Sequence, residues 1–139
     1  EHPDETDGPL YHMVQRGLWE ASKTEQKPYV PPTYDQDGFT HLTKDPKFLL
    51  GIGNHFYKQV SDDFLLLVLD PKKLSAKVVF EPAAAVGNTA SDGLTADKSN
   101  APLFPHLYGS IDHGAVLQEL PISRESATGE FLAIPGLNL

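Results

Sequence analysis

A run of six apolar residues, from Phe64 to Leu69, constrains the fold of this chain more than any other stretch. The run has no polar face, so a strand or helix built from it needs cover on every side. It is short for a helix, and Asp70 and Pro71 end it. We therefore predict a central β-strand that is buried on both faces, which requires further structure above and below it.

Strands are predicted on both sides of this run. Residues 10–14 and 39–43 alternate between inward and outward positions, and residues 77–81 and 115–120 are also strand-like. The order of hydrophobic strand, short turn and second strand favours an antiparallel pairing of residues 64–69 with residues 77–81.

Two helices are predicted. A short one covers Arg16 to Lys23, and a better marked one begins at Pro46, where Asp45 can act as the cap. Gly51 and Gly53 each weaken the second helix by about 1 kcal/mol relative to alanine, so we expect close packing against them. The apolar positions of this helix recur at intervals of four residues: Phe48, Ile52 and Phe56, with Leu49 beside the stripe.

The length of 139 residues favours one domain. We place it at residues 10–122, after a flexible acidic segment of residues 1–9 and before a tail of residues 123–139. The stretch from Pro82 to Pro102 lacks periodicity, and a loop of this length is either functional or disordered. Three apolar side chains of the tail are expected to pack against the domain: Phe131, Leu132 and Ile134.

The net charge of -8 argues against nucleic acid and anionic membranes as partners, because no basic stripe is available to neutralise phosphates. The longest apolar run is too short to span a bilayer. The absence of cysteine excludes disulfides, thiolate zinc sites and cysteine nucleophiles, and it fits a reducing compartment. No signal-peptide pattern is present, so we expect a cytoplasmic protein. The chain lacks an initiator methionine, so a targeting segment can already have been removed.

Two blocks that are far apart in the chain contain the candidate ligand-binding residues. Asp37 to Thr43 and Leu103 to Gly109 each place a histidine among apolar residues, beside a hydroxyl group and a glycine. On a strand, His41 and Thr43 would present a ring nitrogen and a hydroxyl about 7 Å apart, which suits a ribose, a diol or a phosphate. If strand pairing joins the blocks, Tyr108 and a second imidazole enter the same pocket. The nearby aromatic residues are predicted to be core: Tyr11, Trp19, Phe39 and Phe104.

The chain resembles the domain-of-unknown-function family 952 from about Leu10 to about Leu120. The two histidine blocks are the specific marks, because their occurrence together in this order is hard to obtain by chance. Thr40 and Thr43 stand where family members usually have isoleucine and serine. The remaining marks are Leu10-Tyr11-His12, Trp19, Leu65 to Asp70, and Phe80-Glu81-Pro82.

This resemblance implies an α+β fold: a single domain with a curved, mostly antiparallel sheet and two or three helices, similar to the ADP-ribosyltransferase-like superfamily. Enzymes of that superfamily often hold the ribose hydroxyls of NAD with a strand that ends in His-Gly-Ser/Thr. His41-Leu42-Thr43 is similar to that motif, with Leu42 in place of the glycine. Glu81 and Glu119 are the strand-placed candidates for a catalytic glutamate, although fold similarity does not carry a reaction with it.

The first hypothesis is a small-molecule site for NAD, ADP-ribose or a similar nucleotide. His41 and Thr43 would hold ribose hydroxyls while Tyr108 stacks on the ligand. His106 would orient a phosphate or act as an acid–base group, and whether the protein is an enzyme stays open. The candidate binding residues are His12, His41, Thr43, His106 and Tyr108, and the candidate catalytic residues are His106 and Glu81.

The second hypothesis is a divalent-metal site, since imidazole and carboxylate groups suit zinc, iron or nickel. The spacing of the residues fits no compact metal-binding motif. The ligands would be His12, His41, His106 and Glu81.

The third hypothesis is a non-catalytic interaction module in which the histidines are structural. A protein partner would then contact residues 82–102 and the segment from Phe131 to Leu139. Long loops without secondary structure often carry such contacts.

Overall fold

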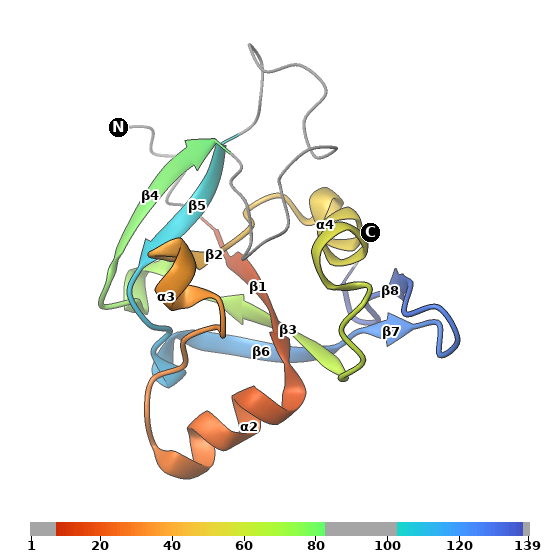
Figure 1. The fold of residues 1–139 in the computed structure, drawn as a ribbon. Helices are drawn as coiled ribbons and strands as arrows, with labels where there is room; N and C mark the ends of the chain where they lie inside the picture. Colours follow the sequence, from red (N-terminus) through yellow and green to blue (C-terminus); the bar gives the residue numbers. More distant parts are fainter. Residues whose placement is uncertain (1–7, 83–102, 138–139) are drawn as a thin grey trace.

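A computed structural model of the chain describes residues 8–82 and 103–137, and Figure 1 shows their arrangement. Within these residues, eight strands form two three-stranded antiparallel sheets and a separate hairpin. The first sheet has the order β1-β3-β6, with β1 at Leu10–Gln15, β3 at Phe64–Leu69 and β6 at Val116–Pro121. The second has the order β2-β5-β4, with β2 at Thr40–His41, β5 at Leu103–Tyr108 and β4 at Lys77–Pro82. The hairpin joins β7 at Ser123–Arg124 to β8 at Phe131–Ala133.

Short helices connect these strands, so the chain is an α+β protein. The longest helix, α2, follows β1 directly and confirms the helix predicted from Arg16. In the described part of the chain, no helix is long and apolar enough to cross a membrane. The helical elements are α2 at Arg16–Glu25, α3 at Tyr34–Asp37, η1 at Pro46–Phe48, α4 at Leu49–Ile52, η2 at Gly53–Tyr57, η3 at Pro71–Lys73 and η5 at His113–Ala115.

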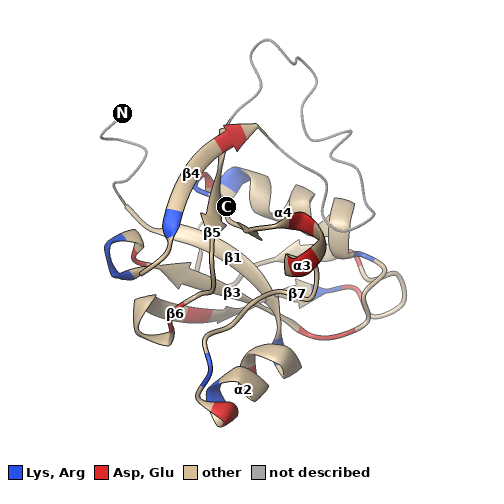
Figure 2. Cartoon of the chain, turned by 60° about the vertical axis from the view of Figure 1, so that its left-hand side comes forward, with Lys and Arg blue, Asp and Glu red and all other residues tan. Residues whose placement is uncertain are grey.

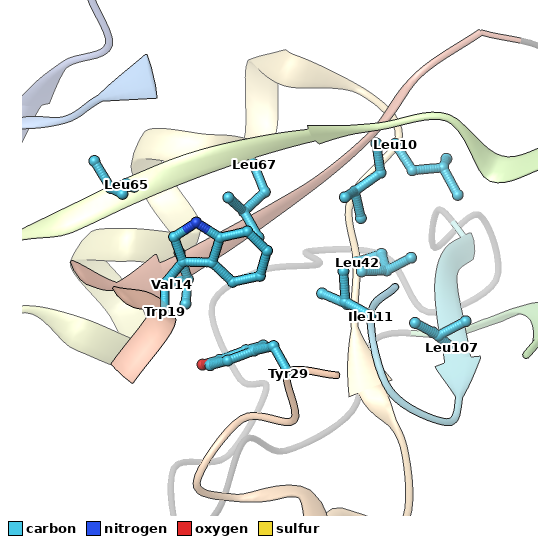
Figure 3. Packing of buried hydrophobic residues seen from close by; sticks show 10 residues of the cluster. Leu10, Val14, Trp19, Tyr29, Leu42, Leu65, Leu67, Leu107 and Ile111 are labelled. Atoms are coloured by element: carbon cyan, nitrogen blue, oxygen red, sulfur yellow. The ribbon is translucent and has the colours of Figure 1, made fainter. Parts of the chain in front are cut away.

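β3 is the central strand of the first sheet, and all of its side chains are buried, so the prediction for this apolar run is confirmed. Figure 3 shows the first of two core clusters, where Trp19 and Tyr29 pack near the strand. Alternate side chains of β3 enter the two clusters, Leu65, Leu67 and Leu69 on one face and Phe64, Leu66 and Val68 on the other. Neither face meets water, which is why the run contains no polar residue.

The pairing predicted between residues 64–69 and 77–81 is wrong. Both edges of β3 are occupied, by β1 and β6, while β4 pairs with β5 in the second sheet. After β3, Asp70 Oδ1 accepts a hydrogen bond of 3.0 Å from the N–H of Lys72 and begins the turn η3. The N–H of Asp70 donates to the Ala115 carbonyl at 2.8 Å. This turn leads the chain away from β3 instead of folding it back as a hairpin.

The helix predicted after Pro46 is divided into three elements of different helical type, η1, α4 and η2. Its buried residues are Leu49 and Gly53, one position further along than the predicted stripe, whose members are only partly buried. The ring of Phe131 lies 2.7 Å from the point that a Cβ on Gly53 would occupy, so the expected close packing is present there. At Gly51 no atom of the described residues lies within 4 Å of the corresponding point, so the expectation of close packing is not met there.

β2 is shorter than predicted because of Pro105 in the neighbouring strand. The N–H of Leu42 donates to the Pro105 carbonyl at 3.0 Å, but proline has no N–H to donate in return. The ladder therefore ends at His41. The chain then reaches the first sheet, where Thr43 and Tyr11 exchange two backbone hydrogen bonds of 2.8 and 2.7 Å. This joint connects the two sheets.

The C-terminal segment contributes to the second core cluster. Phe131 and Ile134 are buried there, as predicted, whereas Leu132 is 47% exposed. Asn54 holds the backbone of Phe131 with hydrogen bonds of 2.6 and 3.2 Å. The loop predicted at residues 82–102 lies almost wholly outside the described residues, so its role as a partner site stays a prediction.

Candidate functional site

The second sheet has two unlike faces, because side chains alternate along its strands. On the inner face, Thr40 of β2 lies opposite Leu107 of β5, and both have 0% exposure. On the outer face, His41 lies opposite His106, with ring centroids 5.7 Å apart in an edge-to-face arrangement. Strand pairing therefore brings the two histidine blocks together.

A carboxylate and an aromatic ring hold His106 in place. Its Nδ1 lies 2.7 Å from Glu81 Oε1, and the hydroxyl of Tyr108 donates to the same oxygen at 2.6 Å. The ring of Phe39 stacks on the imidazole, with centroids 4.1 Å apart and planes 15° from parallel. The hydrogen bonds from Tyr108 and then His106 lower the pKa of Glu81. This carboxylate is therefore charged at neutral pH, and Nδ1 of His106 carries the proton that it accepts.

His41 has a carboxylate partner of its own, Asp37 of the short helix α3. Nε2 of His41 lies 2.9 Å from Asp37 Oδ2, and Gly38 ends α3 with a φ of 84° between the two residues. Burial lowers the pKa of His41, Asp37 acts in the opposite direction, and the neighbouring His106 lowers it further. At neutral pH His41 is thus a neutral imidazole that donates from Nε2 to Asp37 and keeps a lone pair on Nδ1.

His12 lies in the interior and holds β2 through its backbone. It shares the inward face of β1 with Leu10 and Val14, and its Nδ1 lies 2.7 Å from the carbonyl oxygen of His41. Burial lowers the pKa of His12 to about 4, so the neutral ring donates its Nδ1 proton to that carbonyl. Its buried Nε2 has no hydrogen-bond partner within residues 8–82 and 103–137.

The residues predicted as metal ligands do not converge. His12 faces the interior from β1, whereas the other three, His41, His106 and Glu81, belong to the outer face of the second sheet. Among the residues that the structure describes, no group of three histidine, aspartate or glutamate side chains is placed to hold a metal ion. The geometry therefore does not support the metal hypothesis.

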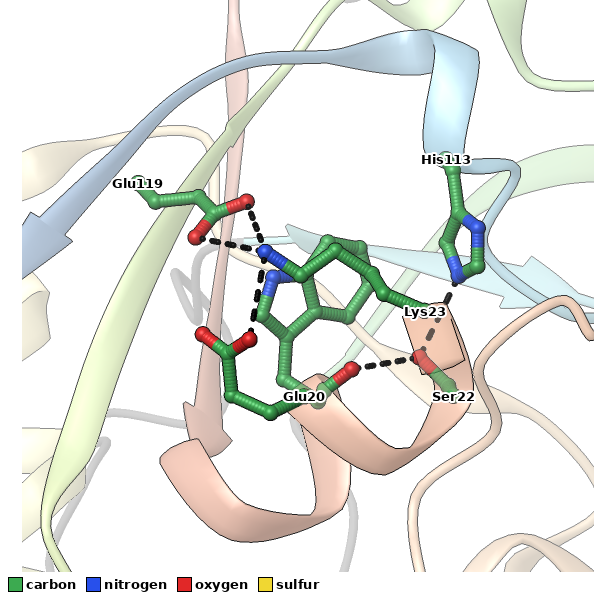
Figure 4. A network of polar contacts seen from close by, with 6 residues as sticks. Glu20, Ser22, Lys23, His113 and Glu119 are labelled. Carbon is green, nitrogen blue, oxygen red and sulfur yellow. Dashed lines mark hydrogen bonds and ion pairs between the residues drawn. The ribbon is translucent and has the colours of Figure 1, made fainter. Parts of the chain in front are cut away.

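Two further candidates lie away from the imidazole pair. Thr43 is buried at the joint between the sheets, so a ligand would have to enter the interior to reach its hydroxyl. Glu119 lies on β6 and accepts hydrogen bonds of 3.1 and 3.3 Å from Lys23 of α2. Figure 4 shows that it belongs to a polar network in which Ser22 of α2 also contacts His113 of η5 at 3.2 Å. This network ties α2 to the end of the first sheet.

Sequence reasoning does not identify two residues that shape the site, Asp37 and Phe39. Asp37 ends α3 and His41 lies on β2, so the turn at Gly38, and not a helical spacing, brings the carboxylate to the ring. Phe39 has the features of a core residue, but it is only partly buried and covers the ring of His106. Its role depends on the pairing of β2 with β5.

The fold is shared with a bacterial protein of known structure. A crystal structure of protein CC0527 from Caulobacter crescentus aligns with a TM-score of 0.66 and 19% identity, covering 89% of this chain and 93% of that chain. A solution NMR structure of the same protein aligns with a TM-score of 0.56 and 17% identity, covering 92% and 91%. At these identities the likeness shows the fold alone. The molecule is thus a small α+β protein whose fold is similar to that of CC0527, with a pair of carboxylate-bound imidazoles on one sheet.

The sequence also shows the family. A family model described as "Protein of unknown function (DUF952)" matches residues 13–119, and the chain belongs to this family. The match includes both histidine blocks and confirms the resemblance. A comparison with curated proteins finds no match. The finer likeness to ADP-ribosyltransferase folds stays a prediction.

Proposed function

We propose that the outer face of the second sheet binds a small nucleotide-like molecule, such as ADP-ribose or NAD. The observation that supports this proposal is the imidazole pair. His41 and His106 come from separate blocks, and their ring centroids lie 5.7 Å apart. A carboxylate orients each ring. Such carboxylates determine which ring nitrogen donates and which accepts, and recognition of a hydroxyl or phosphate depends on that choice.

Each side chain has a role that follows from its hydrogen bonds. Nδ1 of His41 accepts a hydrogen bond from a ribose hydroxyl, because Nε2 is already engaged by Asp37. Nε2 of His106 is the nitrogen left for a hydroxyl or a phosphate oxygen of the ligand, because Nδ1 is engaged by Glu81. The His106 side chain is 3% exposed beneath the stacked ring of Phe39, so binding requires that ring to move aside. The ring of Tyr108 is 42% exposed and offers a surface on which a base can stack.

The proposal includes two finer expectations. If the site is catalytic, His106 and Glu81 are the groups placed for acid–base chemistry, since a hydrogen bond of 2.7 Å joins them. A ligand of the NAD or ADP-ribose type also agrees with the ADP-ribosyltransferase-like fold expected from the family. We place this function in the cytoplasm, which the absence of cysteine favours.

Titration of isotope-labelled protein with ADP-ribose, followed by NMR, tests the proposal. Chemical shifts should change around His41, His106 and Tyr108. His41→Ala and His106→Ala should each weaken binding by about tenfold or more, since each removes an oriented hydrogen-bonding group. His113→Gln is the matched control, because this histidine contacts Ser22 outside the face. A folded protein that shows no response to millimolar ADP-ribose or NAD refutes the proposal and favours the interaction module.

A further inference from the structure

A hollow of about 470 Å³ opens next to the imidazole pair, at the start of β5. Its wall combines aromatic rings with lysines, and Phe48 packs against Phe104 with ring centroids 5.4 Å apart. Two segments line it, residues 44–48 on one side and residues 103–104 on the other.

The hollow and the imidazole face share one wall. Phe104 lines the hollow and lies two residues before His106 on β5, so both side chains project from the same face about 7 Å apart. Phe104 is also the cross-strand partner of Glu81, the carboxylate that binds His106. A molecule held at the imidazoles can therefore extend into the hollow along β5.

The charge in the hollow is positive, in contrast to the chain as a whole. Asp45 uses one carboxylate oxygen for the backbone N–H of Lys47 at 3.1 Å and the other for its ammonium group at 3.6 Å. The ammonium group of Lys44 lies 5.9 Å from the centroid of Phe80, and no acidic side chain of the described residues pairs with it. The residues that line the hollow include two lysines and one aspartate, so the lining has an excess of one positive charge. The protein as a whole has a net charge of -8, and Figure 2 colours the acidic and basic residues of its described part.

We propose that this hollow is the phosphate-binding part of the same site. The phosphate of a nucleotide lies at Lys44 and Lys47, above the aromatic floor of Phe48 and Phe104, while its ribose reaches the imidazoles. This inference rests on the proposed function and sharpens it, because it restricts the ligand to phosphorylated nucleosides. Neutral nucleosides lack the group that the lysines attract.

Calorimetric titration with AMP and with adenosine tests the inference, because the two probes differ only in the phosphate. The wild-type protein should bind AMP about tenfold tighter than adenosine. In the double variant Lys44→Gln/Lys47→Gln, AMP affinity should fall to the level of adenosine, while adenosine affinity stays unchanged. Circular dichroism and the melting temperature verify that the variant is folded.

Lys72→Gln is the matched control for Lys47→Gln. Both lysines follow an Asp-Pro pair, and in both turns the aspartate accepts a hydrogen bond from the lysine N–H, at 3.1 Å for Lys47 and 3.0 Å for Lys72. The control should leave both affinities unchanged. Equal binding of AMP and adenosine, or an equal loss of both in the double variant, overturns the inference while the proposed function stands. Failure of the wild-type protein to bind AMP while it still binds ADP-ribose also overturns the inference alone, whereas failure to bind AMP, ADP-ribose and NAD removes both.

Discussion

The inner and outer faces of the second sheet are built by the same strands and differ in what they contribute. On the inner face, Thr40 and Leu107 have 0% exposure, so this face stabilises the fold by removing surface from water. On the outer face, His41 and His106 engage carboxylates, and Tyr108 stays 42% exposed. His106 is only 2% exposed, so the outer face differs from the inner one in its hydrogen-bonded polar groups of fixed orientation, which are typical of binding sites. Substitutions on the two faces should therefore separate stability from binding.

The largest effect is expected for Leu107→Ala on the inner face. This substitution removes a fully buried side chain from the first core cluster and should lower the free energy of unfolding by about 2–5 kcal/mol. Urea denaturation followed by the fluorescence of Trp19, which is buried in the same cluster, measures the change. Binding by the folded fraction should be retained. A loss below about 1 kcal/mol would show that the inner face is not part of the core.

Acidification should weaken the support beneath the imidazole pair. The pKa of His12 is lowered from 6.5 in the unfolded chain to about 4 in the fold. Because the folded value is the lower one, its contribution is complete above pH 6.5 and is lost as the pH falls toward about 4. Over that window the loss amounts to about 3 kcal/mol.

Urea denaturation at a series of pH values checks this loss against His12→Asn, whose amide can still donate to the His41 carbonyl. The wild-type protein should lose more stability between pH 6.5 and 4 than the variant, because asparagine does not titrate. Glu81 and His41 also have lowered pKa values, but they are present in both proteins. Identical dependence of stability on pH in the two proteins would contradict the assignment of this effect to His12.

A moderate effect is expected for Thr40→Val on the inner face. Its hydroxyl donates to the Gly109 carbonyl at 2.9 Å, and valine keeps the shape of the side chain while removing this donor. The partly buried Gly109 carbonyl then loses this donor, so the free energy of unfolding should fall by about 1 kcal/mol. Thermal unfolding measures the change, and Thr40→Ser retains the hydroxyl as a control. An unchanged melting temperature for the valine variant contradicts the prediction.

The smallest effect on stability is expected for Glu81→Gln on the outer face. The Glu81 side chain is 37% exposed, so stability should change by less than about 1 kcal/mol. His106 nevertheless loses the charged group that orients it, and ADP-ribose affinity should fall by about tenfold. Urea denaturation measures the stability, and calorimetric titration with ADP-ribose measures the affinity. A variant that binds as tightly as the parent would mean that the carboxylate is not needed for recognition.

The positions of most strands are predictable from local sequence patterns. β1, β3, β4 and β6 all lie within one or two residues of their predicted positions, β1 from alternation and β3 from its continuous apolar run. Which strands pair with each other cannot be predicted in this way, because β3 can pair with any strand of suitable length and polarity. β1 and β6 occupy its edges, and β4 is left to pair with β5. The choice among such partners depends on contacts between distant parts of the chain.

The candidate site is likewise predictable from the sequence only in part. The blocks around His41 and His106 are visible as motifs, and their pairing follows once β2 and β5 are neighbours. The roles of Asp37 and Phe39 depend on the single turn of α3 and on the stacking that strand pairing permits. Thr43 belongs to the motif in the sequence, but in the structure its backbone pairs with Tyr11 of the first sheet, away from the imidazole pair.

Residues close together in the chain are sufficient to establish the buried strand β3, the cap at Asp45 and the two histidine blocks. Each of these depends on steric and hydrogen-bonding preferences within a few positions. Residue type does not distinguish His12 from His41, yet one is a buried support with a pKa of about 4 and the other faces the candidate site. That difference arises from packing, because the burial of each ring is set by strands that meet only in the folded molecule.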